Sequence, residues 1–278
     1  AKTAGLPVIS EVELAFSFLA GPVVAITGSN GKSTSAAMTA RILQCAGLDV
    51  ELCGNIGEPL CSKIGGPPGR TFVVELSSFQ LQDVAFFKAD GAALLNLSPD
   101  HLDRHHDFAG YVAAQSRIFE RQTAESTSVL NADDSRFRAI GDRLSESRRR
   151  FFSRRSKVSD GCFMVGADVL EASPGCQSQP LFSASDLQVE GVHNVENAMA
   201  AALLARSRGV SGEAIRSGLA DFPGLPHRLQ KVRRRSGVEW YDDSKGTNPG
   251  ATEKSLLGFP DRSVHLILGG QSKGADPA

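Results

Sequence analysis

The sequence predicts an α/β protein with a mainly parallel sheet flanked by helices, and three observations support this prediction. Apolar, β-branched runs such as 23–26 and 71–75 are typical of buried strands. Helical patterns such as 33–44 and 108–121 fall between the strands, at the spacing typical of βαβ units. A glycine-rich loop joins the first strand to the first helix. At 278 residues the chain is long enough for one large or two ordinary domains.

The glycine-rich loop predicts a phosphate site. In a loop of this kind, glycines let backbone N–H groups approach a polyphosphate, the lysine reaches its outer phosphates, and the next hydroxyl ligates Mg²⁺. The loop departs from the usual pattern at one position. The residue five positions before Gly31 is usually glycine but is Ile26 here, and the first glycine is Gly28. A plain strand-to-helix turn is the alternative. The residues predicted to bind the nucleotide here are Gly28, Ser29, Asn30, Gly31, Lys32, Ser33 and Thr34.

Polar residues also end two other predicted strands. Glu75 closes the strand at 71–75, and α/β proteins bind ligands at the carboxyl ends of their strands, so this carboxylate is a candidate Mg²⁺ ligand beside the phosphates. An ordinary acidic residue at a helix start is the alternative. Asn55 follows the predicted strand at 49–53 in the turn 54–57, where it either contacts a ligand or caps the turn.

Titratable residues are concentrated after the predicted strand at 92–96. The seven residues 100–106 include three histidines and two aspartates. Histidine beside carboxylates suits a second divalent metal or a phosphate, although Mg²⁺ prefers oxygen ligands. His101 is the strongest candidate for such a role. A solvated polar loop is the alternative, above all for His105 and His106.

Composition argues against a nucleic-acid partner. The formal net charge is −1, and the arginine-rich segment 142–160 contains no stacking aromatics except Phe151 and Phe152, which read as a strand. We therefore expect these arginines to form a solvated face. No apolar run approaches membrane-spanning length, which predicts no membrane insertion. The five cysteines include no C-x-x-C pair, so we expect reduced thiols and a cytoplasmic protein.

In the second half of the chain, the sequence predicts an insertion. It also places two asparagines where both could face one ligand. The Gly/Ser/Asp-rich segment 159–190 is consistent with a small hairpin-bearing insertion. A helix from Ala198 to Ser207 follows. Asn194 is the expected N-cap of this helix, and Asn197 lies nearly one turn further on, so both amides could reach the same ligand.

A proline-rich linker at 222–226 marks the expected domain boundary. It divides the chain into a nucleotide-binding domain at 1–223 and the start of a second α/β domain, Rossmann-like in character, at 224–278. In the second domain we expect a basic strand pair, a helix and a strand at 264–268. The chain lacks an initiator Met and stops soon after that strand, so both ends look like cuts.

Eight motifs in a fixed order resemble those of the Mur ligases, and they cover nearly the whole chain. They are Thr-Gly-Ser-Asn-Gly-Lys-Ser-Thr (27–34), Gly-Asn-Ile-Gly (54–57), Glu-Leu-Ser-Ser-Phe-Gln-Leu (75–81), Asp-His-Leu-Asp-Arg (100–104), Asn-Ala-Asp-Asp (131–134), Gly-x-His-Asn (191–194), Gly-Leu-Pro-His-Arg (224–228) and Asp-Ser-Lys-x-Thr-Asn (243–248). The run at 75–81 is most similar to the members that add D-glutamate, rather than L-alanine, a diamino acid or a dipeptide, and differs from folylpolyglutamate synthase.

The resemblance implies a function. Mur ligases have a uridine-nucleotide domain, a central P-loop ATPase and an amino-acid domain, and this chain would hold the central one and the start of the third. It implies an ATP- and Mg²⁺-dependent ligase of peptidoglycan synthesis, a monomer that joins D-glutamate to UDP-N-acetylmuramoyl-L-alanine through an acyl phosphate. A sister amide ligase and a nucleotide-binding module without catalysis are the alternatives.

The resemblance also implies roles for individual residues. Lys32 and Ser33 would serve the phosphates and Mg²⁺, and Glu75 and His101 the metals. The residues implied to contact the muramoyl substrate are Asn55 and Ser77, those for ATP are Asn194, Asn197, Arg228 and Asp243, and those near the acyl phosphate and D-glutamate are Lys245, Thr247 and Lys273.

One position departs from the family pattern. The lysine that is usually carbamylated to hold the second Mg²⁺ is Gln115 here, in the helix Tyr111-Val-Ala-Ala-Gln-Ser-Arg-Ile. A glutamine cannot form a carbamate, and its neutral amide oxygen is a weaker metal ligand. A second metal, or full activity, would therefore require another group such as Asp100 or Asp103 to compensate.

Overall fold

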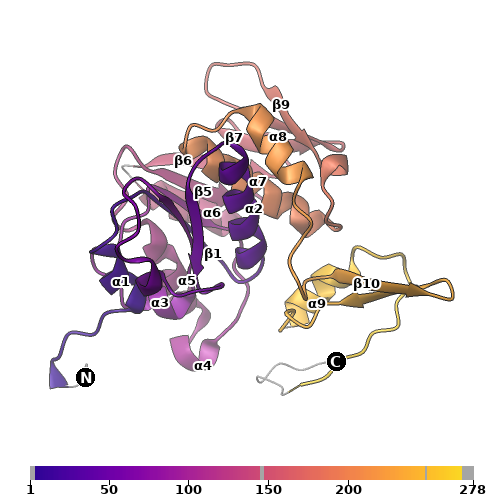
Figure 1. Ribbon diagram of the computed structural model, residues 1–278, viewed down its shortest axis with the longest axis horizontal. Coiled ribbons are helices and arrows are strands. Elements are labelled where there is room, and N and C mark those ends of the chain that lie inside the picture. Colours follow the sequence, from indigo (N-terminus) through magenta and orange to yellow (C-terminus); the bar gives the residue numbers. More distant parts are fainter. Residues whose placement is uncertain (1–3, 145–146, 248, 271–278) are drawn as a thin grey trace.

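The computed structural model describes residues 4–144, 147–247 and 249–270, and its main feature is a nine-stranded sheet (Figure 1). The strand order is β2-β3-β1-β4-β5-β6-β7-β8-β9, with parallel pairing from β2 to β7. The strands are β1 (Val23–Thr27), β2 (Val50–Gly54), β3 (Thr71–Glu75), β4 (Gly91–Leu94), β5 (Thr127–Asn131), β6 (Arg148–Ser153), β7 (Gly161–Val165), β8 (Asp168–Ala172) and β9 (Gln179–Ser183). The predicted α/β class with a mainly parallel sheet is confirmed.

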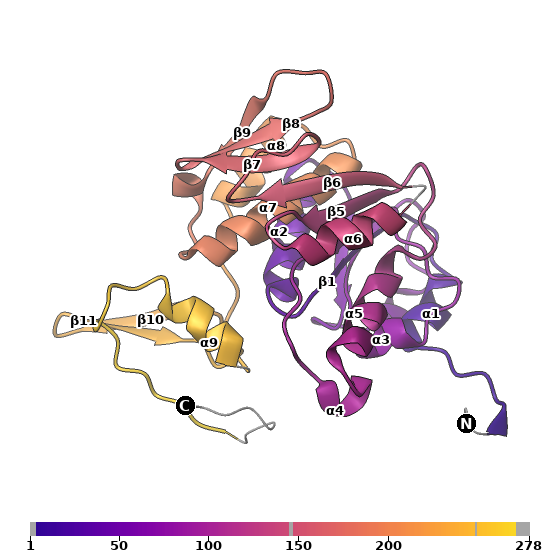
Figure 2. The same cartoon turned by 180° about the vertical axis from the view of Figure 1, so that it is seen from behind.

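Helices cover both faces of the sheet. They are α1 (Glu11–Phe16), α2 (Lys32–Cys45), α3 (Ser78–Gln82), α4 (Leu102–His105), α5 (Phe108–Ser116), α6 (Ser135–Arg143), α7 (Val192–Ser207), α8 (Gly212–Ala220) and the short 3₁₀ helices η2 (Leu60–Lys63), η3 (Arg117–Phe119) and η4 (Ala184–Asp186). Val24 and Ile26 pack toward α2, α7 and α8, while Val23 and Ala25 pack toward α1, α3, α5 and α6. Both cores are therefore fully buried, as a parallel strand of continuous apolar residues requires. Figure 2 shows α5 and α6 in front of the sheet.

The far edge of the sheet is antiparallel. β8 pairs antiparallel with β7 and with β9, so the segment 159–190 forms the expected hairpins and extends the sheet. None of the helices in the described ranges is long and apolar enough to cross a membrane.

The arginines of β6 correct one prediction. Arg148 and Arg149 are exposed, but Arg150 is 4% exposed. Its Nε donates to Asp160 Oδ1 and its Nη2 to Glu171 Oε1, both at 2.9 Å. Alternation along the strand places Arg148 and Arg150 on the same face, where both contact Asp160, but Arg150 is the buried one of the two. The predicted solvated face is therefore wrong at Arg150.

Beyond the linker, a second sheet holds only the antiparallel pair β10 (Gln230–Arg235) and β11 (Val238–Asp242) within the described residues, followed by α9 (Pro249–Leu256). The predicted strand pair and helix are confirmed. The predicted strand at 264–268 is wrong, because neither sheet pairs with this segment and Ile267 is 86% exposed. An apolar run forms a strand when a neighbour accepts its hydrogen bonds. The domain boundary at 223/224 stays a prediction.

Candidate nucleotide site

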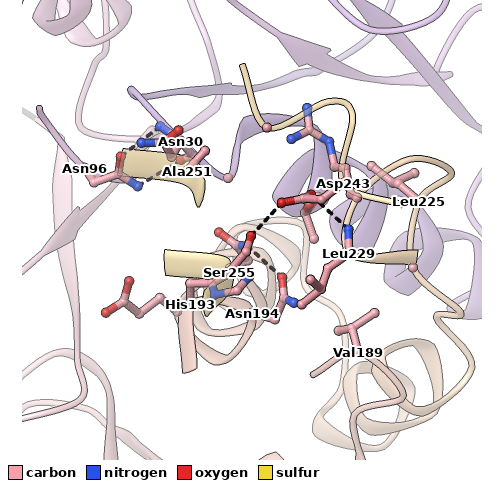
Figure 3. Close-up of a pocket in the computed structure, with 17 residues that line it drawn as sticks. Asn30, Asn96, Val189, His193, Asn194, Leu225, Leu229, Asp243, Ala251 and Ser255 are labelled. Carbon is pink, nitrogen blue, oxygen red and sulfur yellow. Dashed lines mark hydrogen bonds between the residues drawn. The ribbon is translucent and has the colours of Figure 1, made fainter. Parts of the chain in front are cut away.

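The glycine-rich loop joins β1 to α2, and neighbouring segments contact it closely on two sides. Gly28 and Gly31 have φ values of 142° and 85°, which favour glycine. A Cβ at Gly31 would lie 2.2 Å from Oδ1 of Asn197, so a side chain at this position would collide with α7. On the other side, Asn96 Oδ1 accepts from Asn30 N and Asn96 Nδ2 donates to Asn30 O, both at 2.8 Å (Figure 3).

Lys32 begins α2 and folds back over the loop. Its Nζ donates to the carbonyl oxygens of Gly28 at 2.7 Å and Ser29 at 3.0 Å. Burial lowers the pKa of Lys32, and the nearby Glu75 carboxylate acts against that shift. The ammonium group is therefore held at the mouth of the loop, where a phosphate would relieve the cost of burying its charge.

Glu75 lies beside the loop because β3 pairs with β1. Its backbone is in register with Ile26 on one side and Gly54 on the other. Oε1 accepts a 2.8 Å hydrogen bond from Asn55 Nδ2, whereas Oε2 is buried and has no hydrogen-bond partner among the described residues. A buried carboxylate oxygen without a donor is costly unless a cation approaches it. Together with the Ser33 hydroxyl at the start of α2, this oxygen fits a hydrated Mg²⁺, a cation that usually takes one or two carboxylates plus phosphates and waters.

Asn194 and Asn197 are hydrogen-bonded to each other beside the loop, and their contact with one shared ligand stays a prediction. Asn197 Oδ1 accepts from Ser35 Oγ at 3.2 Å, and its Nδ2 donates to Asn194 Oδ1 at 3.1 Å. The capping role given to Asn194 is wrong, because α7 begins at Val192 and its N-cap is Gly191. The helix thus starts earlier, and Asn194 Nδ2 donates back to Glu190 O at 2.6 Å.

The segment after the linker forms the opposite wall of a cleft that opens to solvent. Arg228 Nη2 donates to Ser33 Oγ at 2.8 Å, so it reaches the phosphate loop itself. Asp243 follows β11 and accepts from Leu229 N at 2.9 Å and Ser255 Oγ at 2.7 Å (Figure 3). The four residues that the family resemblance assigns to ATP, Asn194, Asn197, Arg228 and Asp243, all line this cleft.

Apart from residues of the phosphate loop, the other predicted site residues in the described part of the chain do not line this cleft. Lys245 and Thr247 are exposed in the turn after Asp243. Ser77 is the N-cap of α3, in a capping box with Gln80, so its hydroxyl already has a structural partner. Lys273 lies outside the described residues.

The histidine-rich segment separates into different environments. His101 has a left-handed backbone (φ 52°), and its Nε2 is 3.8 Å from Asp100 Oδ1. His105 is buried, and its Nε2 lies 2.9 Å from Ser78 Oγ, so its ring belongs to the packed interior rather than to a solvated loop. The described residues contain no group of three or more His, Cys, Asp or Glu side chains that could hold a metal. The metal role of His101 stays a prediction.

Gln115 does not fit a metal site. Its Oε1 accepts from Thr27 Oγ1 and its Nε2 donates to Tyr111 OH at 2.8 Å, and the side chain is 2% exposed. Both ends of the amide are therefore engaged by the protein.

Sequence reasoning missed two side chains that hold the loop. The sequence predicts Asn96 only as the end of a strand, and Tyr111 only as a residue within the helix 108–121. The signal for Asn96 was available, because an amide directly after the strand beside β1 lies at the ligand edge. Tyr111 gave no such signal, since its contact with the loop depends on how α5 packs.

Comparison with known proteins agrees with this geometry. The Mur ligase middle-domain model matches residues 26–205. The chain belongs to the Mur ligase family. The UDP-N-acetylmuramoylalanine–D-glutamate ligase of Acidobacterium capsulatum is 43% identical over 274 residues, 98% of this chain and 59% of the relative. The corresponding ligase of Koribacter versatilis is 41% identical over 276 residues, 99% of this chain and 60% of the relative.

Solved Mur ligases share the fold. MurF from Acinetobacter baumannii has a TM-score of 0.70 and 21% identity over 90% of this chain and 57% of its own. MurF from Thermotoga maritima in complex with ADP has a TM-score of 0.66 and 21% identity over 90% of this chain and 60% of its own. The chain thus spans about three fifths of the length of these family members.

Proposed function

We propose that this chain is the ATP-binding core of a ligase that joins D-glutamate to UDP-N-acetylmuramoyl-L-alanine in peptidoglycan synthesis. The observation that carries the proposal is the phosphate loop, which lines a cleft together with Arg228 and Asp243 and has the unpartnered Glu75 Oε2 on the neighbouring strand. The substrates rest on the names of the relatives that are 41–43% identical.

The reaction requires the negative charges of the carboxylate and the phosphates to be neutralised. The substrate carboxylate attacks the γ-phosphorus of ATP and ADP leaves; the amine of D-glutamate then attacks the acyl phosphate and phosphate leaves. Lys32 and Arg228 would neutralise the phosphates, and backbone N–H groups of the loop would orient them. Ser33 and Glu75 would hold Mg²⁺, which would supply further neutralisation of the phosphate charge.

The remaining roles follow the same assignment. We propose that Asn55 and Ser77 lie toward the muramoyl substrate, and that Lys245, Thr247 and Lys273 lie toward the acyl phosphate and D-glutamate. We also propose a domain boundary at 223/224, a monomer and a location in the bacterial cytoplasm. The five cysteines, which form no disulfide, agree with a reducing compartment.

The test places this chain in the frame of a complete relative. The matching 274 residues of the Acidobacterium capsulatum ligase are replaced by this chain, and phosphate release is measured with ATP, UDP-N-acetylmuramoyl-L-alanine and a panel of amino acids. We expect release that depends on D-glutamate and is lost with Lys32→Ala. Release with another amino acid would identify a sister ligase. Absence of release, with Mg·ATP still bound, would identify a binding module.

A further inference from the structure

Two side chains of α5, one helical turn apart, contact the phosphate loop and the end of the strand that leads into it. Tyr111 OH lies 2.9 Å from Ser29 Oγ, and Gln115 Oε1 accepts from Thr27 Oγ1. The two are joined to each other, since Gln115 Nε2 donates to Tyr111 OH at 2.8 Å. Helix α5 therefore holds the last residue of β1, Thr27, and the second residue of the loop, Ser29.

These contacts are buried. Tyr111 is 1% exposed, Gln115 2%, Ser29 5% and Thr27 0%. Hydrogen bonds between buried polar groups are costly to break, because the partner left behind is desolvated and unpaired. Burial also raises the pKa of Tyr111, so its hydroxyl keeps its proton.

The loop side of this network is anchored a second time. Ser98 N donates to Ser29 Oγ at 2.9 Å, and Ser29 Oγ donates to Ser98 O at 3.0 Å. Behind Tyr111, the His105 ring packs edge to face with a centroid separation of 5.5 Å, and Phe79 stacks on His105 at 5.7 Å. Tyr111 is thus backed by packed rings, which fixes where its hydroxyl points.

We propose that Tyr111 and Gln115 are positioning residues that clamp the phosphate loop in its nucleotide-binding shape, and that position 115 in this chain serves the loop rather than a metal ion. The inference rests on the proposed nucleotide site. It extends that proposal by assigning part of the affinity for phosphates to a helix that does not touch them.

The test compares ADP affinity of the full chain with and without metal, by calorimetry in Mg²⁺ and in EDTA. Tyr111→Phe and Gln115→Met each remove part of the clamp at nearly constant volume. Ser128→Ala is the matched control, because Ser128 is a buried hydroxyl of β5 that bonds to Gln122 and Ser147. Thermal unfolding of every variant is followed in parallel.

We expect Tyr111→Phe and Gln115→Met each to weaken ADP binding about three- to tenfold, equally in Mg²⁺ and in EDTA. The double variant should lose less than the product of the two effects, because the residues form one network. Ser128→Ala should lower the unfolding temperature and leave ADP affinity unchanged, which separates positioning from general stability.

Two results would overturn the clamp. If both variants bind ADP as the parent does, the contacts do not position the loop. If Gln115→Met weakens binding in Mg²⁺ but not in EDTA, position 115 acts through the metal. A parent chain that binds no nucleotide would instead reject the proposed function itself, and the clamp with it.

Discussion

Arg228 Nη2 lies 2.8 Å from Ser33 Oγ, although the two residues are 195 positions apart in the chain. This contact brings the segment after the linker onto the phosphate loop. The backbone on either side of Arg228 is left-handed, at His227 (φ 63°) and Leu229 (φ 45°), and it is held there by hydrogen bonds. A guanidinium placed in this way can donate two hydrogen bonds to one phosphate.

Replacement of Arg228 should therefore weaken nucleotide binding. We expect Arg228→Lys to raise the Kd for ADP about tenfold, because an ammonium group cannot reproduce the planar fork of the guanidinium. Calorimetry on the full chain measures the effect. Arg233→Lys, on the exposed strand β10, is the control and should bind as the parent does. Equal affinity in both variants would remove Arg228 from the site.

Lys32→Ala should abolish nucleotide binding without unfolding the protein. The ammonium group bonds to two loop carbonyls, and burial disfavours its charge, so its removal costs the folded state little. Calorimetry and circular-dichroism melting test the two parts of this prediction. Retained binding would show that the loop is not a phosphate site.

The ion pairs of β6 allow a buried and an exposed arginine to be compared on one carboxylate. Arg150 and Arg148 both contact Asp160, but their side chains are 5% and 53% exposed. We expect Arg150→Ala to lower the free energy of unfolding by about 3 kcal/mol, because two acidic groups lose their buried partner. Arg148→Ala should cost less than about 1 kcal/mol. Urea unfolding measures both, and equal losses would contradict the buried network.

The hairpin beyond the linker should loosen in acid. The hydrogen bond from His227 holds the pKa of Asp242 at about 2, below its ordinary 3.8. Because the folded pKa is the lower one, the stabilisation is present above about pH 4 and is lost as the pH falls toward 2. Trp240, the single tryptophan, lies on β11 and reports this change by fluorescence.

Asp242→Asn should remove most of that pH dependence. The variant lacks the carboxylate, so its Trp240 emission should already differ from the parent at pH 5 and change little on further acidification. Asp186 is an exposed carboxyl residue outside the hairpin and serves as the control. In Asp186→Asn, the Trp240 emission should change with pH as it does in the parent. An unchanged acid transition in Asp242→Asn would contradict the assignment.

The sequence predicted those parts of the fold and site that depend on local patterns. The strand, loop and helix at 23–45 were predictable because β-branched residues, glycines and helix formers each favour one local state. That Asn194 and Asn197 lie on the same side of a helix was predictable from their spacing. The first residue of α7 was not, since Gly191 and Asn194 are both acceptable caps.

Long-range packing accounts for what the sequence did not predict. Arg150 is buried because Asp160 and Glu171 reach it from a neighbouring loop and strand. Residues 264–268 have the composition of a strand, but in the described part of the chain no other strand pairs with them. Gln115 was identified as a departure from the family pattern, but its contacts with Thr27 and Tyr111 depend on how α5 docks beside β1.

We propose above all that Glu75 and Ser33 hold Mg²⁺ on a nucleotide bound by the loop. Calorimetric titration of the full chain with ADP, in Mg²⁺ and in EDTA, tests it most directly when repeated with Glu75→Gln. We predict one nucleotide per chain, tighter binding in Mg²⁺, and loss of that Mg²⁺ effect in Glu75→Gln. Absence of binding, or a Mg²⁺ effect that survives in Glu75→Gln, would contradict the account.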